Sequence, residues 1–126
     1  MWDLEPTDEF NRRAKRFSKK HSRELKAVLT NLARVQTALR EGASPQRLPF
    51  GFVHGEQAGV LALDQRGGGG SLMEARLYIY LDQNTKTLHA ITLGDKRTQA
   101  DDVDFAAKFV RALTDKNETN RGKSDG

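Results

Sequence analysis

The stretch that decides the fold is EARLYIYLD, residues Glu74–Asp82. Every second position along it is apolar, which is the period of a β-strand with one buried face. The apolar set is Ala75, Leu77, Ile79 and Leu81. The alternate set contains Arg76, Tyr78 and Tyr80, so we predict that these three side chains occupy the opposite face of a sheet.

Two further strands flank this one. Val60–Leu63 is a short apolar run typical of a buried strand, and Thr87–Leu93 is a strand segment that Gly94 ends. Asp82–Lys86 is short enough for a hairpin loop, and the glycine run Gly67–Gly70 predicts a flexible turn. Three consecutive strands joined by short turns predict an antiparallel meander.

Two helices are predicted before this meander. A short strand at Trp2–Leu4 ends at Pro6, and Thr7 is a typical N-cap for the first helix. The apolar positions of that helix are Phe10, Ala14 and Phe17. Ser22 is expected to cap a second helix, which stops at Gly42. Its apolar stripe is Leu25, Val28, Leu29, Leu32, Val35 and Leu39. The two segments indicate a helical hairpin or one long kinked helix.

The remaining segments are less regular. Leu48–Gly59 contains three glycines and is expected to be irregular. A last helix begins at Asp101 or Asp102. Its apolar side is Val103, Ala106, Ala107, Val110 and Leu113. Residues 114–126 are polar and predict a disordered tail, which leaves residues 1–113 as the folded domain.

Together these elements predict an α+β fold in the order β, α, α, β, β, β, α. An N-terminal strand and a helical hairpin pack on an antiparallel sheet of three to four strands, and a helix ends the domain. Because both apolar helix stripes need burial, we expect the helices to cover one face of the sheet.

Composition excludes several classes of protein. The chain has 126 residues, 37% apolar and 30% charged, with a mean hydropathy of −0.70, so it can build one soluble core. No apolar run approaches the roughly 20 residues of a membrane helix. The N-terminus lacks the basic and apolar regions of a signal peptide. The chain has no cysteine, which excludes disulfides and thiolate metal sites. We therefore expect a cytoplasmic protein.

Positive charge concentrates in the first helical region of a chain with a sequence pI of about 9.6 and a net charge of +4. Residues 12–26 contain eight cations and one acid, Glu24. The six that we assign to an RNA- or ribosome-binding surface are Arg12, Lys15, Arg16, Lys19, Lys20 and Arg23. Cations at this density repel one another. Binding to the phosphates of a nucleic acid relieves that repulsion, because each phosphate carries a negative charge. The alternatives are a solvated helix face and, ranked lower, a membrane surface.

Arg76 is the most informative single cation. In mid-strand, its guanidinium can hold a phosphate through two hydrogen bonds. Tyr78 and Tyr80 lie beside it on the same predicted face and can stack on bases. The alternative is a polar sheet face on which Arg76 pairs with Glu74 or Asp64.

Lys96 and Arg97 follow the last strand, within the segment Gly94–Gln99. Adjacent cations at this strand end can converge with Arg76 on one phosphate. The alternative is a solvated turn.

The three histidines show no metal-ligand spacing, so we expect no metal and no cofactor. His54 lies in the irregular segment before the meander, and His21 lies between the two helices. His89 is predicted on the same strand face as Ile91 and Leu93, as a packed or an edge histidine.

The layout resembles the RelE/HigB-type toxins of bacterial toxin–antitoxin systems, part of the RelE/ParE superfamily. The resemblance starts with the strand at Trp2–Leu4, then Phe10 with the run of cations, then the leucine-rich second helix. It is sharper at Glu74–Tyr80 and Leu88–Gln99, and it covers most of residues 1–113.

The resemblance implies a ribosome-dependent mRNA endonuclease that needs no metal and is neutralised by a cognate antitoxin. In that chemistry the RNA 2′-hydroxyl attacks the neighbouring phosphate. Arg76 matches the family's strand arginine, which is a ligand of the phosphate, and Lys96 and Arg97 match the cations that close the last strand. Tyr80 and His54 are our candidates for proton transfer, chosen from residue type and expected position.

One departure from the family pattern concerns the end of the chain. Many active members carry a His or Tyr there, whereas neither follows Arg97 in this sequence. Two alternatives therefore stay open: a ParE-like gyrase inhibitor, and a catalytically inactive protein of the same fold that binds RNA or an antitoxin.

Overall fold

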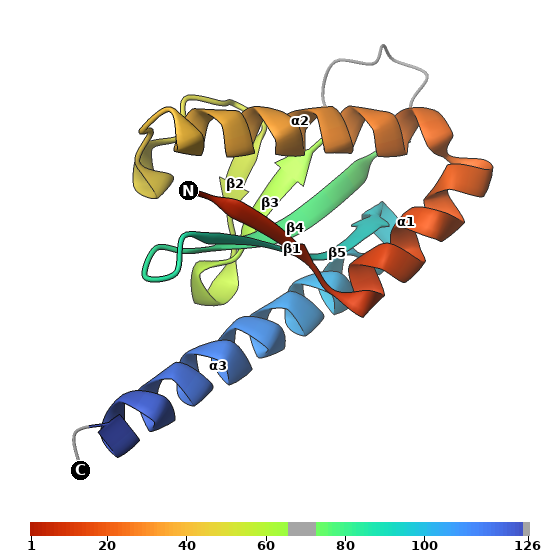
Figure 1. The fold of residues 1–126 in the computed structure, drawn as a ribbon. Coiled ribbons are helices and arrows are strands. Elements are labelled where there is room, and N and C mark those ends of the chain that lie inside the picture. Colours follow the sequence, from red (N-terminus) through yellow and green to blue (C-terminus); the bar gives the residue numbers. More distant parts are fainter. Residues whose placement is uncertain (66–72, 125–126) are drawn as a thin grey trace.

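The computed structural model describes residues 1–65 and 73–124, with side chains described through residue 116, so the turn predicted at Gly67–Gly70 lies outside the described residues. The helices and strands are β1 (Asp3–Pro6), α1 (Asp8–Lys20), α2 (Ser22–Arg40), β2 (Val53–Gly55), β3 (Leu61–Asp64), β4 (Ala75–Asp82), β5 (Thr87–Asp95) and α3 (Gln99–Ser124) (Figure 1). The short 3-10 helices are η1 (Pro45–Arg47), η2 (Gln57–Gly59) and η3 (Lys96–Thr98).

The five strands form one sheet in the order β1-β5-β4-β3-β2. The predicted meander is confirmed, because β3, β4 and β5 pair antiparallel in chain order. β1 pairs in parallel with β5, so the sheet is mixed and not the antiparallel sheet of three to four strands that we predicted. β2 adds to β3 at the other edge. Sequence patterning missed β2 because three residues are too few to show alternation.

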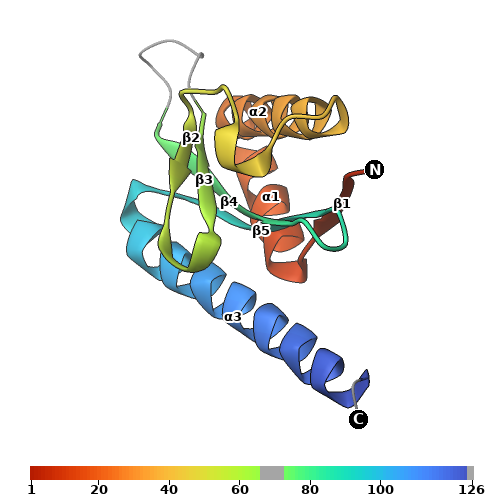
Figure 2. The same ribbon diagram turned by 90° about the vertical axis from the view of Figure 1, so that its left-hand side faces the viewer.

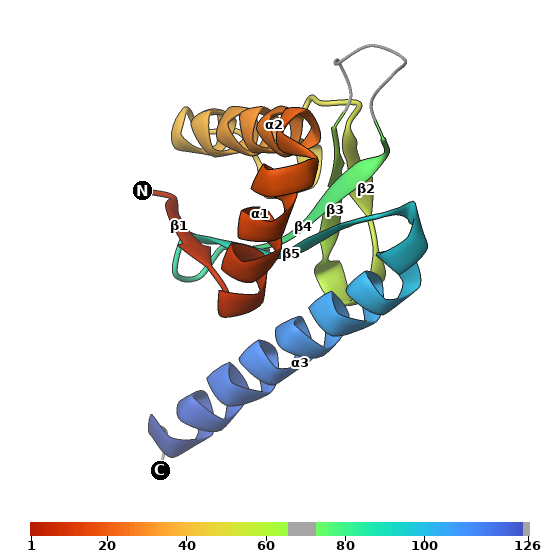
Figure 3. The same cartoon turned by 90° about the vertical axis from the view of Figure 1, so that its right-hand side faces the viewer.

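Helices cover both faces of the sheet. α1 and α2 lie on one face, and α3 crosses the other (Figures 2 and 3). The prediction that the helices share one face is therefore wrong for α3. The reason is a second apolar core on the α3 face, made by Val60, Ala62, Tyr78, Ile91, Val103, Ala106 and Val110. Sheet residues that are apolar on both faces require a cover on each.

A β-bulge decides which residues of β5 join this second core. Consecutive residues of β4 pair with Ala90 and Thr92, so Ile91 has no partner on β4. The extra residue puts Ile91 in the α3-side core, whereas Leu93 packs in the core beneath α1 and α2. The expected common face for His89, Ile91 and Leu93 is thus corrected, although His89 is buried as predicted.

The helix ends explain why α1 and α2 form a hairpin. The Thr7 hydroxyl accepts a hydrogen bond of 3.0 Å from the Phe10 amide and caps α1. His21 has a non-helical backbone between the two helices, so they are not one kinked helix, and it is His21 and not Ser22 that stands at the α2 cap. Gly42, with φ of +103°, adopts the left-handed conformation that ends a helix.

The last helix is longer than we predicted. α3 begins at Gln99, before Asp101, and continues to Ser124. Residues 114–124 are therefore helical in the structure, where composition predicted a disordered tail, because extending a formed helix fixes one residue for each new hydrogen bond. Within the described chain, no helix combines the length and apolar content that membrane crossing requires.

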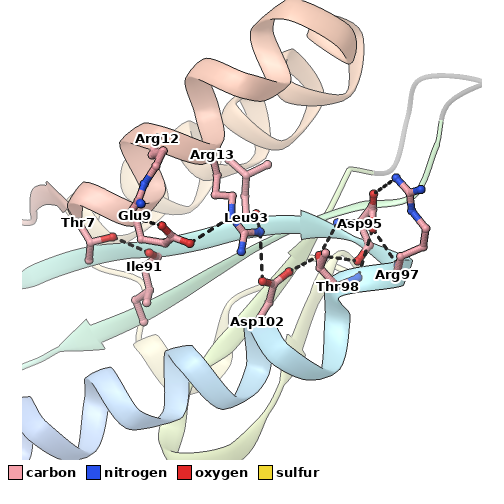
Figure 4. Close-up of polar contacts among 10 residues, drawn as sticks. All are labelled: Thr7, Glu9, Arg12, Arg13, Ile91, Leu93, Asp95, Arg97, Thr98 and Asp102. Carbon is pink, nitrogen blue, oxygen red and sulfur yellow. Dashed lines mark hydrogen bonds and ion pairs between the residues drawn. The ribbon is translucent and has the colours of Figure 1, made fainter.

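Side chains of α1 and of its N-cap complete the open edge of β5. β1 pairs with β5 only as far as Ala90. Beyond that point the Thr7 hydroxyl donates to the Ile91 carbonyl at 2.6 Å, and Arg13 Nη1 donates to the Leu93 carbonyl at 3.0 Å (Figure 4).

The same arginine reaches α3. Arg13 Nη1 lies 3.2 Å from Asp102 Oδ1, and Asp102 Oδ2 accepts a hydrogen bond of 2.6 Å from the Thr98 hydroxyl (Figure 4). α1, β5 and α3 are therefore joined by one polar network at this end of the sheet.

Gly94 lies against this network, and a methyl group there would collide with the side chains of Asp102 and Thr98. We predict that Gly94→Ala lowers the free energy of unfolding by about 1–3 kcal/mol, as overpacking does elsewhere. Urea denaturation measures the change. The matched control is Gly55→Ala in β2, where nothing lies within 4 Å of the added carbon, and its effect should stay within about 0.5 kcal/mol. Equal effects at the two glycines would contradict the packing argument.

A histidine in the α3-side aromatic group makes stability depend on pH. The His89 ring stacks on Tyr80 and meets the edge of Phe109, with centroid separations of 6.2 and 5.6 Å. Burial lowers the pKa of His89 below its ordinary 6.5. The negative charges of Glu5 and Asp82 act in the opposite direction, but the effect of burial is larger. The unfolded chain therefore binds this proton at a higher pH than the folded chain does.

We predict that this contribution to the free energy of unfolding is complete above about pH 6.5 and is lost as the pH falls from there toward the folded pKa. His89→Phe removes this titration, while the other histidines remain in both proteins. Urea denaturation between about pH 5 and 8 should show a shallower decline for the variant. Parallel curves for the two proteins would rule out His89 as the source.

Candidate functional site

His54, Asp64 and Arg76 meet at one end of the sheet. His54 Nε2 lies 2.7 Å from Asp64 Oδ2, and Arg76 Nε lies 3.1 Å from Asp64 Oδ1. One carboxylate thus holds both a histidine and an arginine. The Arg76–Asp64 pair is one of the two pairings expected from sequence for the alternative of a polar sheet face.

The strand register produces this meeting. Asp64 of β3 lies directly opposite Arg76 of β4, and His54 of β2 lies opposite Ala62 of β3. Opposed residues of antiparallel strands share a face, and so do residues two apart on one strand. The three side chains therefore project from the same face, that of α3, although they come from three different strands.

These side chains line a hollow of about 350 Å³, together with neighbouring residues at the ends of β3 and β4. The full lining is His54, Asp64, Gln65, Glu74, Ala75 and Arg76. Exposure rises across the group, from 15% for the Asp64 side chain through 26% for Arg76 to 41% for His54. The carboxylate is the shielded anchor, and the histidine is the group most open to a ligand.

The contacts leave reactive atoms available. Because Asp64 engages Nε2 of His54, a neutral imidazole that donates from Nε2 has Nδ1 as its basic nitrogen. Because Asp64 engages Nε of Arg76, the two terminal nitrogens of the guanidinium remain as donors for an anion. The group can therefore accept a proton and bind a phosphate within one hollow.

Asp64 is the residue of this group that sequence reasoning missed as a functional candidate. From sequence, Asp64 was named only as an ion-pair partner for Arg76. The signal that would have found it is the pairing of two predicted strands, since aligning Val60–Leu63 with Glu74–Asp82 as a hairpin brings the next residue, Asp64, beside Arg76.

The two tyrosines lie outside this group. Tyr78 is fully buried under α3, so the prediction that it stacks on bases is wrong. The same burial raises the pKa of Tyr78 to about 12. Tyr80 shares the face of Arg76 but lies four positions further along β4, where its ring stacks on His89 and contacts Gly59.

Lys96 and Arg97 lie in η3, directly after β5. Ala75 pairs with Asp95, which brings η3 to the end of the sheet where Arg76 lies. Arg97, however, bonds to the Asp95 carboxylate at 3.1 Å and borders a different hollow, against α1 (Figure 4).

Asp95 also caps η3. Its carboxylate accepts hydrogen bonds from the backbone amides of Arg97 and Thr98. Burial on its own would raise the pKa of Asp95, but the hydrogen bonds from Arg97 and Thr98 outweigh it and hold that pKa below its ordinary value. The carboxylate therefore stays charged and holds Arg97 in place.

The basic residues of the first helix divide into groups with different surroundings. Arg13 points inward and is structural, as described above. Arg12 is exposed but paired with Glu9 at 2.6 Å. Arg16 and Lys20 border the hollow next to Arg97. The remaining members of the predicted RNA-binding set are exposed: Lys15, Lys19 and Arg23.

Within the described part of the chain, no three His, Asp or Glu side chains gather closely enough to hold a metal ion.

Comparisons with known proteins support the fold. No protein-family model matches this chain, and no curated protein matches it significantly. Among solved structures, the crystal structure of YafQ from E. coli strain BL21(DE3) matches with a TM-score of 0.51 and 20% sequence identity, covering 79% of this chain and 98% of YafQ. The resemblance read from the motifs is thereby confirmed at the level of architecture, and the chain has a RelE-like α+β fold.

Proposed function

We propose that this chain is the toxin of a type II toxin–antitoxin system and arrests growth by cutting ribosome-bound mRNA in the cytoplasm. Two observations support this. The fold is similar to that of YafQ, a RelE-family toxin of a toxin–antitoxin system. The single observation that carries the chemistry is the His54–Asp64–Arg76 group in its hollow.

In the proposed reaction the RNA 2′-hydroxyl is the nucleophile and no metal takes part. Nδ1 of His54 accepts the 2′-hydroxyl proton while Asp64 orients the ring and stabilises the imidazolium that forms. The 2′-oxygen bonds to phosphorus, and the bond from phosphorus to the 5′-oxygen breaks. The 5′-oxygen takes a proton from water, which leaves a 2′,3′-cyclic phosphate and a 5′-hydroxyl.

Cations stabilise the charge that develops on the phosphate. The terminal nitrogens of Arg76 face two non-bridging oxygens, the geometry in which a guanidinium binds a phosphate best. Lys96, exposed at the end of β5 near Arg76, adds a positive charge to the same end of the sheet. Arg97 contributes from the neighbouring hollow and not from the cleavage hollow itself.

The exposed cations of α1 and the start of α2 provide the docking surface for ribosomal RNA in this proposal. Arg12, Lys15, Lys19 and Arg23 are all exposed, so their charges can neutralise phosphates without breaking a core contact. The proposal also implies a cognate antitoxin, a second protein that binds the toxin and silences it.

We predict that His54→Ala and Arg76→Ala each lower mRNA cleavage by about 100-fold or more, the usual loss when a proton-transfer group or a charge-stabilising donor is removed. Primer extension on ribosome-bound message in a cell-free translation reaction measures the cleavage. The control is Arg111→Ala, an exposed arginine on α3 far from the hollow in sequence. If Arg76→Ala kept full cleavage, the assignment of the site would be wrong.

The same reaction separates the competing functions. Growth arrest on expression with no cut message, together with loss of supercoiling by purified gyrase, would replace the proposal with gyrase inhibition. No effect in either assay would indicate an inactive protein of this fold.

Tyr80 provides a separate test, because it was a proton-transfer candidate from sequence and lies apart from His54. We predict that Tyr80→Phe changes cleavage by less than about tenfold, below the contribution of a general acid or base. A loss of about 100-fold, with the unfolding midpoint unchanged, would restore Tyr80 to the reaction and require a longer substrate path along β4.

A further inference from the structure

A second hollow lies on the other side of the β4–β5 strand pair, between the end of α1 and η3. Its volume is about 250 Å³, below the roughly 300–1,000 Å³ of sites for drug-sized molecules, so it suits a small group. The charged residues that line it are Arg13, Arg16, Lys20, Asp95 and Arg97.

Two of these cations have no acidic partner among the residues that the structure describes. Arg13 is engaged by Glu9 and Asp102, and Arg97 is engaged by Asp95. Arg16 and Lys20, in contrast, form no ion pair with any described residue. The hollow therefore carries an excess of positive charge that the fold itself does not neutralise.

The helix and the strand end bring these charges to the same hollow. Arg16 and Lys20 are four residues apart, so they lie on one face of α1. The buried ring of Phe17 and the backbone of Gly94 also line the hollow. Arg97, held by Asp95, borders the other side.

We propose that this hollow binds a phosphate group of an RNA chain, at a subsite separate from the cleavage hollow. Arg16 supplies paired donors to the phosphate oxygens, and Lys20 supplies a point charge. That the phosphate belongs to RNA rests on the proposed function, whereas the preference for a phosphate rests on the charge and size of the hollow alone.

The register relates the two subsites. Gly94, which lines the second hollow, lies opposite Arg76, which lines the first, on adjacent strands about 4.8 Å apart. One RNA strand that passes around this end of the sheet can therefore place nearby phosphates in both hollows. The second subsite then selects which phosphate is presented to His54.

The test measures binding of a fluorescent single-stranded RNA whose 2′-positions are methylated, so that it cannot be cut. The full-length variant Arg16→Gln/Lys20→Gln is compared with Lys108→Gln/Arg111→Gln, which removes the same two charges from the exposed surface of α3. Fluorescence anisotropy over a series of salt concentrations gives the affinity and its salt slope. Unfolding midpoints verify that both variants fold.

We expect the first variant to lose about tenfold or more in affinity and its salt slope to flatten by about 0.7, the value for one phosphate contact on a single strand. The α3 control should keep both values. Equal losses in the two variants would show that only overall charge matters and would overturn the proposal.

A second arm uses inorganic phosphate and follows the backbone amide signals of Gly94 and Thr98 by NMR. We expect phosphate to shift them in the wild type and not in Arg16→Gln/Lys20→Gln, and the methylated RNA to displace it. Phosphate binding that RNA does not compete with would assign the hollow to a free anion and overturn the RNA part. Because neither arm needs cleavage, failure of the proposed function and failure of this subsite are distinguishable.

Discussion

β1 pairs with β5 only as far as Ala90. Beyond that point the Arg13 side chain, which extends from α1, supplies a hydrogen bond to the open edge of β5. Its guanidinium bonds the Leu93 carbonyl and pairs with Asp102 on α3. The Asp102 side chain is 2% exposed, and burial raises its pKa, while its contacts with Thr98 and Arg13 lower it. A buried carboxylate without a partner is costly, so α1, β5 and α3 are bound to one relative position.

That constraint places both hollows. α3 must start beside Asp95 to bring Asp102 to Arg13, and it then runs away across the sheet (Figure 3). Its path buries Tyr78 in the second core, whereas His54, Asp64 and Arg76 on the neighbouring strands border a hollow. The end of α1 meets η3 on the opposite side and forms the second hollow. The cores and the candidate sites thus follow from one polar junction.

Much of the fold was predictable because period and capping are local properties. EARLYIYLD alternates over its whole length and forms β4 from Ala75 onward, the apolar stripes predicted α1 and α2, and Gly42 predicted the end of α2. Local signals failed where partners distant in sequence decide. The parallel pairing of β1 with β5 joins segments from the two ends of the domain. The bulge at Ile91 moves that side chain to the other face of the sheet, and no glycine or proline marks it in the sequence. α3 packs on the face where the sheet already presents apolar residues.

The sequence by itself determined the chemistry that this protein carries: an uncommon density of cations, a mid-strand arginine and few histidines, because these are matters of residue type. Only the tertiary structure decided which of them meet. Strand register brought His54 and Arg76 to Asp64 and placed Tyr80 four positions away along β4, because side chains on neighbouring strands meet when they share a face and lie directly or diagonally opposite one another. The Asp95 carboxylate holds Arg97, which lines the hollow beside α1, so the cations expected around one phosphate border two hollows.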